Sequence, residues 1–253
     1  MKMNKYNNDK AYRIIAPFYD TLMGNRKYQR WKELMNDVIF KYGITPGTCL
    51  DIACGTGNFS LRMKELGFHL IGVDKSRPMI KEARKKLAGE KFIQSDIRRF
   101  NIPASYQSKI NLVVCFFDSL NYLLTDKDLL MALQSVYRNV PSGTIFVFDM
   151  NPMDHVRVAQ TFRPRVNEEK NFYSIFRFGG RGRFWTINMD FFINKGNYYH
   201  HLSETHVEKG YDMKDVLSLL KKTKFGILEI RKEYKIYEDN KEHLSRLYFI
   251  VKK

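Results

Sequence analysis

Residues 50–57, which read Leu50-Asp51-Ile52-Ala53-Cys54-Gly55-Thr56-Gly57, decide how this chain folds. They end an apolar run that starts at Thr48 and precede a helical pattern over residues 59–66, so they join a strand to a helix. The two glycines let the backbone turn tightly and allow a ligand close to the main chain, where amide groups at the helix start point outward. The stretch therefore predicts a ligand-binding turn at the end of a first strand.

Short apolar strands alternate with helices around this turn. We expect strands over residues 48–53, 68–73, 92–96, 110–117 and 144–148, and helices over residues 59–66, 78–87 and 126–137. Such alternation is typical of a parallel sheet covered on both faces, an α/β fold. Upstream, helical spacing predicts a helix over residues 26–42. A shorter helical segment before it is expected to end at Ala16-Pro17, because proline disfavours a helical conformation in the preceding residue.

After Asp149 the pattern changes to aromatic stretches of β character. Residues 172–178, 184–193 and 198–207 predict an antiparallel meander of about three strands, with turns at residues 179–182 and 194–197. A helix over residues 213–222 and strands over residues 227–237 and 244–251 follow. We therefore expect a single domain, divided into a helical cap (1–43), a core (44–150), an inserted meander (151–211) and the end of the core (212–253).

The composition excludes a disordered or membrane-spanning chain. Of the 253 residues, 44% are hydrophobic and 14% are aromatic, which suffices for a large core. No apolar run approaches the roughly 20 residues needed to cross a bilayer. The polar start has no stretch like a signal peptide, and the three cysteines form no CxxC pair. We expect a cytoplasmic protein without a disulfide framework or a metal site.

The net charge of +16 attracts anionic partners such as nucleic acid or acidic small molecules. The basic residues are scattered, however, in short clusters such as residues 81–86 and 221–224 that acidic or apolar residues interrupt. Scattered lysines are typical of a solvated surface, so we expect no nucleic-acid partner.

Acidic residues after the first three strands indicate which ligand the turn binds. Asp51 would repel a pyrophosphate but suits a ligand with a cationic group, and Ser60 replaces the third glycine of a dinucleotide fingerprint. Asp74, at the end of the second strand, can accept both hydroxyls of a ribose. Asp96 can accept an adenine amino group, and Ile97 beside it can cover the ring. The pattern favours a nucleoside that carries a positive charge.

In order and spacing these residues resemble the class I S-adenosylmethionine-dependent methyltransferases, by motif over residues 12–149 and by topology over the rest. The chain looks most like the branch of small-molecule N-methyltransferases that act on amino sugars, glycine and peptide natural products. Tyr19-Asp20, Tyr28, Trp31 and residues 117–122 support that branch. The resemblance implies a Rossmann-like, seven-stranded and mostly parallel sheet, with S-adenosylmethionine as cofactor and S-adenosylhomocysteine as product.

The resemblance also implies a set of cofactor contacts. They fall on Tyr12, Tyr19, Trp31, Asp51, Ala53, Gly55, Gly57, Asp74, Lys75, Met79, Asp96, Ile97 and Cys115. The turn would line the methionine part, with Asp51 holding its geometry, while Asp74 grips the ribose. Residues Lys75, Met79, Asp96 and Ile97 would surround the adenine, and Cys115 would touch the cofactor through its backbone. The aromatic residues Tyr12, Tyr19 and Trp31 would close over the methionine end.

Methyl transfer from a sulfonium depends mainly on alignment, which can contribute roughly 7–11 kcal/mol. A dry aromatic pocket favours the dispersed charge of the transition state. If the acceptor is an amine, its proton can pass to Asp118, Tyr122 or His206, which the sequence does not rank. In some relatives a histidine proposed as general base occupies the position of Tyr122, whereas an unperturbed phenol has a pKa near 10.

We expect the acceptor to be a small molecule or short peptide, bound beneath the meander. The charge leaves an RNA or tRNA methyltransferase as an alternative, although residues 117–122 lack the Asn/Asp-Pro-Pro-Tyr/Phe motif for base amines. A non-catalytic cofactor-binding protein is the other alternative. The sequence leaves open whether the protein is a monomer or a dimer.

Overall fold

A seven-stranded sheet forms the centre of the protein in a computed structural model that describes residues 8, 11–24, 26–237 and 240–253. The strands are β1 (Thr48–Ile52), β2 (His69–Asp74), β3 (Lys91–Gln94), β4 (Ile110–Cys115), β5 (Ile145–Met150), β10 (Gly226–Ile236) and β11 (Glu242–Lys252). Their order is β10-β11-β5-β4-β1-β2-β3, and only the pairs β11–β5 and β10–β11 are antiparallel. The predicted seven-stranded, mostly parallel sheet is confirmed.

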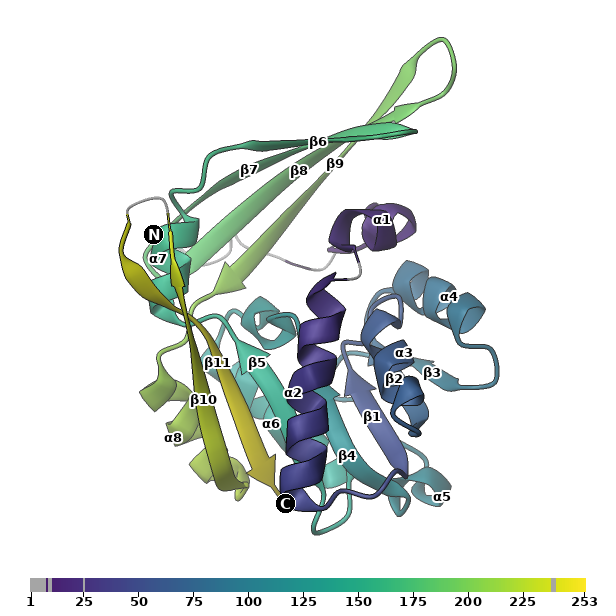
Figure 1. The fold of residues 1–253 in the computed structure, drawn as a ribbon, viewed down its shortest axis with the longest axis vertical. Helices are drawn as coiled ribbons and strands as arrows, with labels where there is room; N and C mark the ends of the chain where they lie inside the picture. The colour runs from purple at the N-terminus through teal and green to yellow at the C-terminus, as the bar shows by residue number, and fades with distance from the viewer. Residues whose placement is uncertain (1–7, 9–10, 25, 238–239) are drawn as a thin grey trace.

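Helices cover both faces of this sheet (Figure 1). The covering helices are α2 (Arg26–Tyr42), α3 (Asn58–Glu65), α4 (Arg77–Lys86), α6 (Asp126–Asn139) and α8 (Met213–Thr223), while the short helices α5 (Ala104–Gln107) and α7 (Met153–Ala159) lie near the ends of the strands. Strand residues alternate between the faces: Leu112 and Val114 pack in the cluster that includes α2 and α3, and Val113 packs with α6 and α8. Both faces are therefore apolar, as buried parallel strands require.

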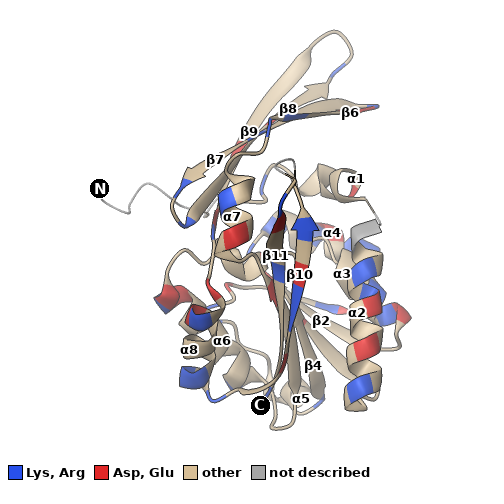
Figure 2. Cartoon of the chain, turned by 60° about the vertical axis from the view of Figure 1, so that its left-hand side comes forward, with Lys and Arg blue, Asp and Glu red and all other residues tan. Residues whose placement is uncertain are grey.

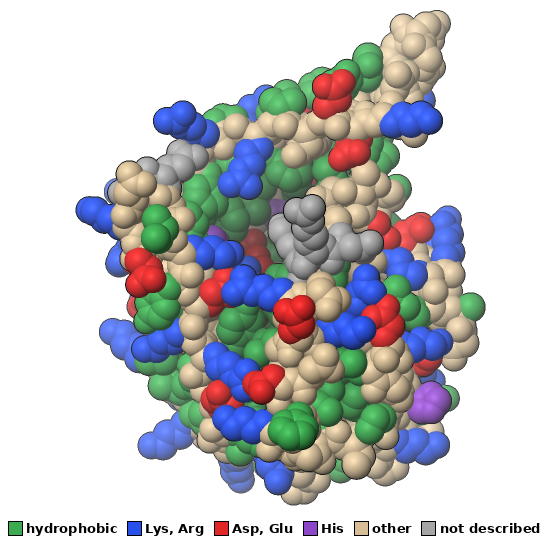
Figure 3. Space-filling model, in the orientation of Figure 1, with side chains coloured by type: hydrophobic (Ala, Val, Ile, Leu, Met, Phe, Trp, Pro, Cys, Tyr) green, Lys and Arg blue, Asp and Glu red, His purple; other side chains and the backbone are tan. Residues whose placement is uncertain are grey.

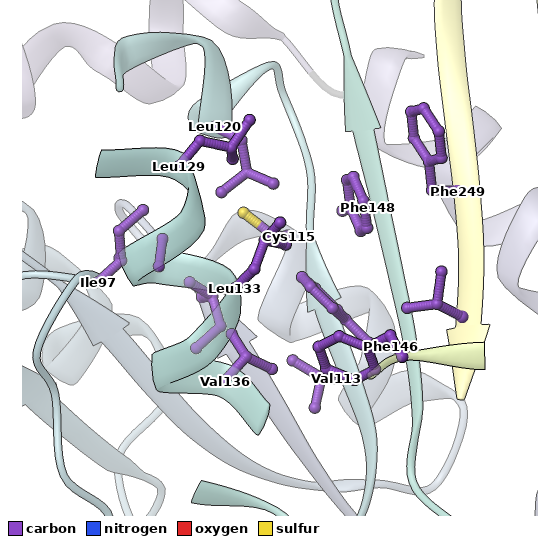
Figure 4. Packing of buried hydrophobic residues seen from close by; sticks show 14 of the residues in the cluster. Ile97, Val113, Cys115, Leu120, Leu129, Leu133, Val136, Phe146, Phe148 and Phe249 are labelled. Atoms are coloured by element: carbon purple, nitrogen blue, oxygen red, sulfur yellow. The ribbon is translucent and has the colours of Figure 1, made fainter. Parts of the chain in front are cut away.

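Aromatic side chains fill the core beneath α6 (Figure 4). Phe146 and Phe148 of β5 and Phe249 of β11 are fully buried, and the rings of Phe148 and Phe249 stack with centroids 4.9 Å apart. Leu129 and Leu133 of α6 belong to the same cluster. This packing joins the antiparallel end of the sheet to its parallel part.

A separate four-stranded antiparallel sheet stands above the carboxyl ends of the parallel strands (Figure 1). It consists of β6 (Arg165–Glu169), β7 (Phe172–Arg181), β8 (Phe184–Asn194) and β9 (Tyr199–Lys209). The sequence predicts about three of these strands. It misses β6, an edge strand with the polar sequence Arg-Val-Asn-Glu-Glu and little burial, and it misses α7 before that strand.

Two predicted boundaries are wrong. Pro17 begins a helical turn, η2 (Ala16–Phe18), instead of ending one, and α1 (Tyr19–Met23) follows directly. A proline fits the first turn of a helix because its missing N–H has no partner there. The turn expected at residues 179–182 is also shorter, since Arg181 pairs with Phe184 and leaves a two-residue loop.

Lys and Arg residues are spread over several elements, including α2, α7, α8 and β10, and acidic residues lie among them along the chain (Figure 2). The basic excess therefore forms no continuous stripe in this view. In the described part of the chain, no helix combines the length and apolar character that crossing a membrane requires.

Phe148→Ala should lower the free energy of unfolding by about 3–5 kcal/mol, because it leaves a cavity between β5 and β11. Phe40→Ala on α2 is the control: Phe40 is 89% exposed, so its loss should change stability by less than about 0.5 kcal/mol. Urea unfolding of both variants measures the difference. Equal effects would show that the Phe148 packing does not stabilise the fold.

Candidate active site

The glycine turn after β1 has a left-handed backbone at three positions, with φ of 58° at Ala53, 54° at Gly55 and 77° at Gly57. A Cβ on Gly55 would meet no atom within 4 Å, so this residue faces open space. A Cβ on Gly57 would lie 3.3 Å from side-chain carbons of Ala83 and Leu87. The first glycine thus opens the turn to a ligand, whereas the second lets α3 begin close to α4.

The Asp74 carboxylate joins this turn to the next strand. Its Oδ2 accepts from the Gly55 amide at 2.9 Å, and its Oδ1 accepts from the Ser76 amide at 2.7 Å. Burial raises the pKa of Asp74, although both hydrogen bonds oppose that shift. The carboxylate therefore lies at the junction of the turn and α4, as the ribose assignment requires.

A cavity of about 650 Å³ opens beside this junction. That volume lies within the range of small-molecule sites. Nine of the predicted cofactor residues line it, namely Tyr12, Tyr19, Ala53, Gly55, Asp74, Lys75, Met79, Asp96 and Ile97, and so does Tyr122. Asp51 lines a small adjoining recess together with Tyr19, Ala53, Gly55 and Phe117. The structure thus brings together residues from the turn, from three strand ends and from the N-terminal segment.

Three other predicted cofactor residues line neither the cavity nor the recess. Gly57 packs against α4, and Cys115 is fully buried in the core. Trp31 lies one layer below the recess, where its ring stacks on Phe117 with centroids 4.2 Å apart and its Nε1 donates to Asp149 at 3.3 Å. In the structure Trp31 supports Phe117 from beneath.

Asp96 is already paired with a residue that the sequence analysis did not consider. Arg98 donates to both carboxylate oxygens of Asp96, at 3.0 Å and 2.6 Å, and reaches Asp128 at 2.7 Å. Burial opposes ionisation, but these contacts lower the pKa of Asp96 below its usual range. The pair keeps Asp96 ionised and fixes its carboxylate at the edge of the cavity.

The loop after β4 is strained at two consecutive residues, since Phe117 and Asp118 have φ of 61° and 52°. Arg246 of β11 donates to Asp118 at 3.0 Å and also contacts Asp149. Burial opposes ionisation of Asp118, but Arg246 lowers its pKa. A carboxylate held in an ion pair is a poor proton acceptor, so the geometry favours a positioning role for Asp118.

Tyr122, from η3 (Ser119–Tyr122), starts a chain of hydrogen bonds that leads away from the cavity. Its hydroxyl accepts from the Tyr12 hydroxyl at 2.7 Å and lies 2.9 Å from His206 Nδ1. His206 Nε2 lies 2.6 Å from Glu204 Oε1. Burial raises the pKa of Tyr122 well above its ordinary value. Of the three predicted proton acceptors, the structure links Tyr122 and His206 and places Asp118 in another network.

Sequence reasoning missed Glu204, Arg98 and Arg246 as parts of the site. Glu204 and His206 lie two residues apart on a strand, so their side chains share one face, and that spacing was an available signal. Arg246 had no such signal, because its partners are 97 and 128 residues away in the chain.

The residues around the cavity fit S-adenosylmethionine. Asp74 and Asp96 line the cavity with carboxylates that can accept hydrogen bonds from ribose hydroxyls and from an adenine amino group, and Met79 and Ile97 line it with apolar surface against which a ring can pack. The open space over Gly55 admits a ligand against the backbone. No group of three His, Cys, Asp or Glu side chains among the described residues is arranged to hold a metal ion.

Comparisons with known proteins agree with this geometry. Residues 49–143 match the family model described as a methyltransferase domain. YqeM of Bacillus subtilis (strain 168), assigned as a methyltransferase without a stated acceptor, is 28% identical over 96% of this chain and 97% of its own length. The dTDP-3-amino-3,4,6-trideoxy-α-D-glucopyranose N,N-dimethyltransferase of Streptomyces venezuelae is 34% identical over 40% of each chain.

A methyltransferase of known structure also has a similar fold. The crystal structure of an S-adenosylmethionine-dependent methyltransferase from Clostridium acetobutylicum ATCC 824 superposes with a TM-score of 0.79 at 23% identity, over 94% of this chain and 97% of the other. Together the matched domain and the similarity to YqeM indicate that the chain is a methyltransferase, and its fold resembles that of S-adenosylmethionine-dependent methyltransferases. The lining of the cavity suits S-adenosylmethionine as the methyl donor.

Asp51→Asn should stabilise the protein relative to wild type increasingly as the pH rises from about 4 to about 7. Burial raises the pKa of Asp51 to about 7, and nearby Asp74 adds to that effect against the hydrogen bond from Ser60. An unfolded aspartate has a pKa of about 3.9, so between these values the native state binds more protons than the unfolded state, and its stability falls as pH rises.

Urea unfolding of both proteins across this range measures that difference. Asparagine does not titrate, so the gap between the variant and wild type should widen up to about pH 7 and then stay constant. A gap that is independent of pH would show that Asp51 keeps its ordinary pKa in the folded protein.

Proposed function

We propose that this methyltransferase transfers a methyl group to an amine nitrogen of a small molecule or short peptide. The observation that carries this proposal is the shared cavity, which extends from Asp74 and Asp96 to the hydroxyl-bearing residues Tyr19 and Tyr122. A donor bound with its nucleoside at the two carboxylates would direct its methionine end toward the tyrosines and the recess at Phe117. The amino-sugar N,N-dimethyltransferase among the relatives supports an amine acceptor.

The acceptor site would lie beneath the four-stranded sheet. We propose that residues 151–211, which include this sheet, are an insertion in a single methyltransferase domain and that they cover the acceptor. Figure 3 shows a hollow between this sheet and the body of the protein, with hydrophobic side chains inside and both basic and acidic side chains around it. The net charge of +16 favours an acceptor that also carries a carboxylate or phosphate.

When bound, S-adenosylmethionine would supply an electrophilic methyl group, whose carbon an aligned nucleophile attacks as the sulfur leaves. The protein's part is to orient that nucleophile and to exclude water. Tyr12 and Tyr19 form an edge-to-face pair with centroids 5.9 Å apart, and Phe117 closes the recess beside them. We assign Tyr122 as the group that receives the proton of the amine, because it lines the cavity and its hydroxyl bonds to His206.

Incubating the protein with S-adenosylmethionine and a panel of amines tests the function. The panel contains amino sugars, glycine and short peptides with a free N-terminus, and mass spectrometry detects the added methyl group. We expect a methylated amine. Methylation of bulk tRNA with no amine product would instead support the nucleic-acid alternative, and binding without any methylation would support a non-catalytic protein.

Tyr122→Phe should lower kcat for that amine by about 100-fold, because it removes the proton-accepting oxygen and keeps the ring. Tyr42→Phe on α2 is the matched control: its hydroxyl donates to Glu229 outside the cavity, so kcat should stay at the wild-type value. An unchanged kcat in Tyr122→Phe would remove Tyr122 from the proton path.

Asp74→Asn should weaken binding of S-adenosylmethionine by at least about 10-fold, since a hydrogen bond to a charged group contributes about 1.5–3 kcal/mol. Asp190→Asn on β8, outside the cavity, should leave the affinity unchanged. Calorimetric titration measures both affinities, and urea unfolding checks that both variants fold. A folded Asp74→Asn variant with wild-type affinity would contradict the ribose assignment.

A further inference from the structure

We propose that Glu204 is a positioning residue that orients His206 to take the proton of Tyr122, so that Glu204, His206 and Tyr122 act as a relay. This inference rests on the proposed function, because the relay starts at an amine in the cavity. The relay joins Glu204 and His206 of β9 to Tyr122 of η3, which is 84 residues from His206 in the chain.

The relay is a continuous line of short contacts. Tyr122 lines the cavity, its hydroxyl lies 2.9 Å from His206 Nδ1, and His206 Nε2 lies 2.6 Å from Glu204 Oε1. His206 is 3% exposed and Glu204 is 7% exposed. Both side chains are therefore shielded from water, and each one orients the other through the contact between them.

The carboxylate decides which imidazole nitrogen carries the proton. An ionised carboxylate can only accept hydrogen bonds, so the contact with Glu204 requires the hydrogen on His206 Nε2. The Tyr12 amide also lies 3.4 Å from Nε2, but it donates to the nearer Glu204 Oε1, so Nε2 need not accept from it. The second ring nitrogen, Nδ1, is then an acceptor that faces the Tyr122 hydroxyl. Burial opposes ionisation of Glu204, but its bonds to His206 and to backbone amides lower its pKa. The carboxylate is thus ionised when it orients the ring.

The proton count of the step balances. As the acceptor becomes a free amine, one of its N–H bonds breaks and its proton moves to the Tyr122 oxygen. The original Tyr122 O–H bond breaks, and its proton moves to His206 Nδ1. The resulting imidazolium is paired with the Glu204 carboxylate until the proton returns to solvent. Tyr122 never becomes a phenolate, which the burial of its hydroxyl disfavours.

Glu204 has a second set of partners that offers a competing explanation. Its Oε2 accepts from the amides of Ile14 and Ile15, at 2.8 Å and 3.2 Å, and its Oε1 also accepts from the Tyr12 amide. Tyr12 lines the cofactor cavity. A purely structural Glu204 would hold residues 12–15 over the cofactor and have no effect on proton transfer.

A double-mutant cycle separates these explanations. We expect Glu204→Gln to lower kcat for the methylated amine by about 10-fold or more, and to add nothing in a Tyr122→Phe background, because residues of one relay act as a unit. Calorimetry should show that the affinity for S-adenosylmethionine changes by less than about 3-fold. Glu65→Gln on α3, whose carboxylate pairs with Lys32 and Arg62 outside the cavity, is the control and should leave kcat and affinity unchanged.

Equal losses of kcat in both backgrounds, or a loss of cofactor affinity that matches the loss of kcat, would overturn the relay. Nitrogen NMR of the imidazole rings provides an independent test that needs no acceptor. The His206 signals, identified by their loss in His206→Asn, should show Nε2 protonated and Nδ1 bare. A proton on Nδ1 alone would overturn the relay even if no amine is methylated, so this failure is distinct from that of the proposed function.

Discussion

The hydrogen bond from the Gly55 amide to the Asp74 carboxylate is the contact on which the rest of the site depends. It ties the turn after β1 to the end of β2 and so fixes a turn in which Ala53 has a left-handed backbone, a conformation that is unfavourable for a residue with a Cβ. The second oxygen of the same carboxylate accepts from Ser76 at the start of α4, so one side chain fixes three elements. The cavity is the space that this arrangement leaves open.

The sequence predicted the central sheet because its strands are short, apolar and separated by helices, a pattern that local periodicity records. It missed β6 and misread Pro17 for physical reasons. The edge strand β6 is exposed and polar, so no period of burial marks it. A proline fits both the end of one turn and the start of the next, and only the packing of α1 decides between them.

The residues of the site also divide into those that a local pattern marks and those that only the folded chain brings together. The carboxylates of Asp74 and Asp96 were predictable, because parallel strands end at one edge of the sheet and each of these residues follows such a strand. Arg246 was not, since its partners Asp149 and Asp118 are 97 and 128 residues away in the chain, whereas the two-residue spacing of Glu204 and His206 was a signal in the sequence that was overlooked. Aromatic residues were the least certain, because Trp31 and Phe117 pack on each other and only one of them borders open space.

Donor recognition and the groups behind Tyr122 come from different parts of the chain. In the proposed binding mode residues 53–98 would hold the nucleoside end, whereas the second sheet supplies Glu204 and His206. Substitutions in residues 165–203 would then change the acceptor site without changing the residues that line the donor end of the cavity. Glu204 is the exception, since it also binds the backbone of residues 12–15, and evolution cannot alter it without affecting both halves.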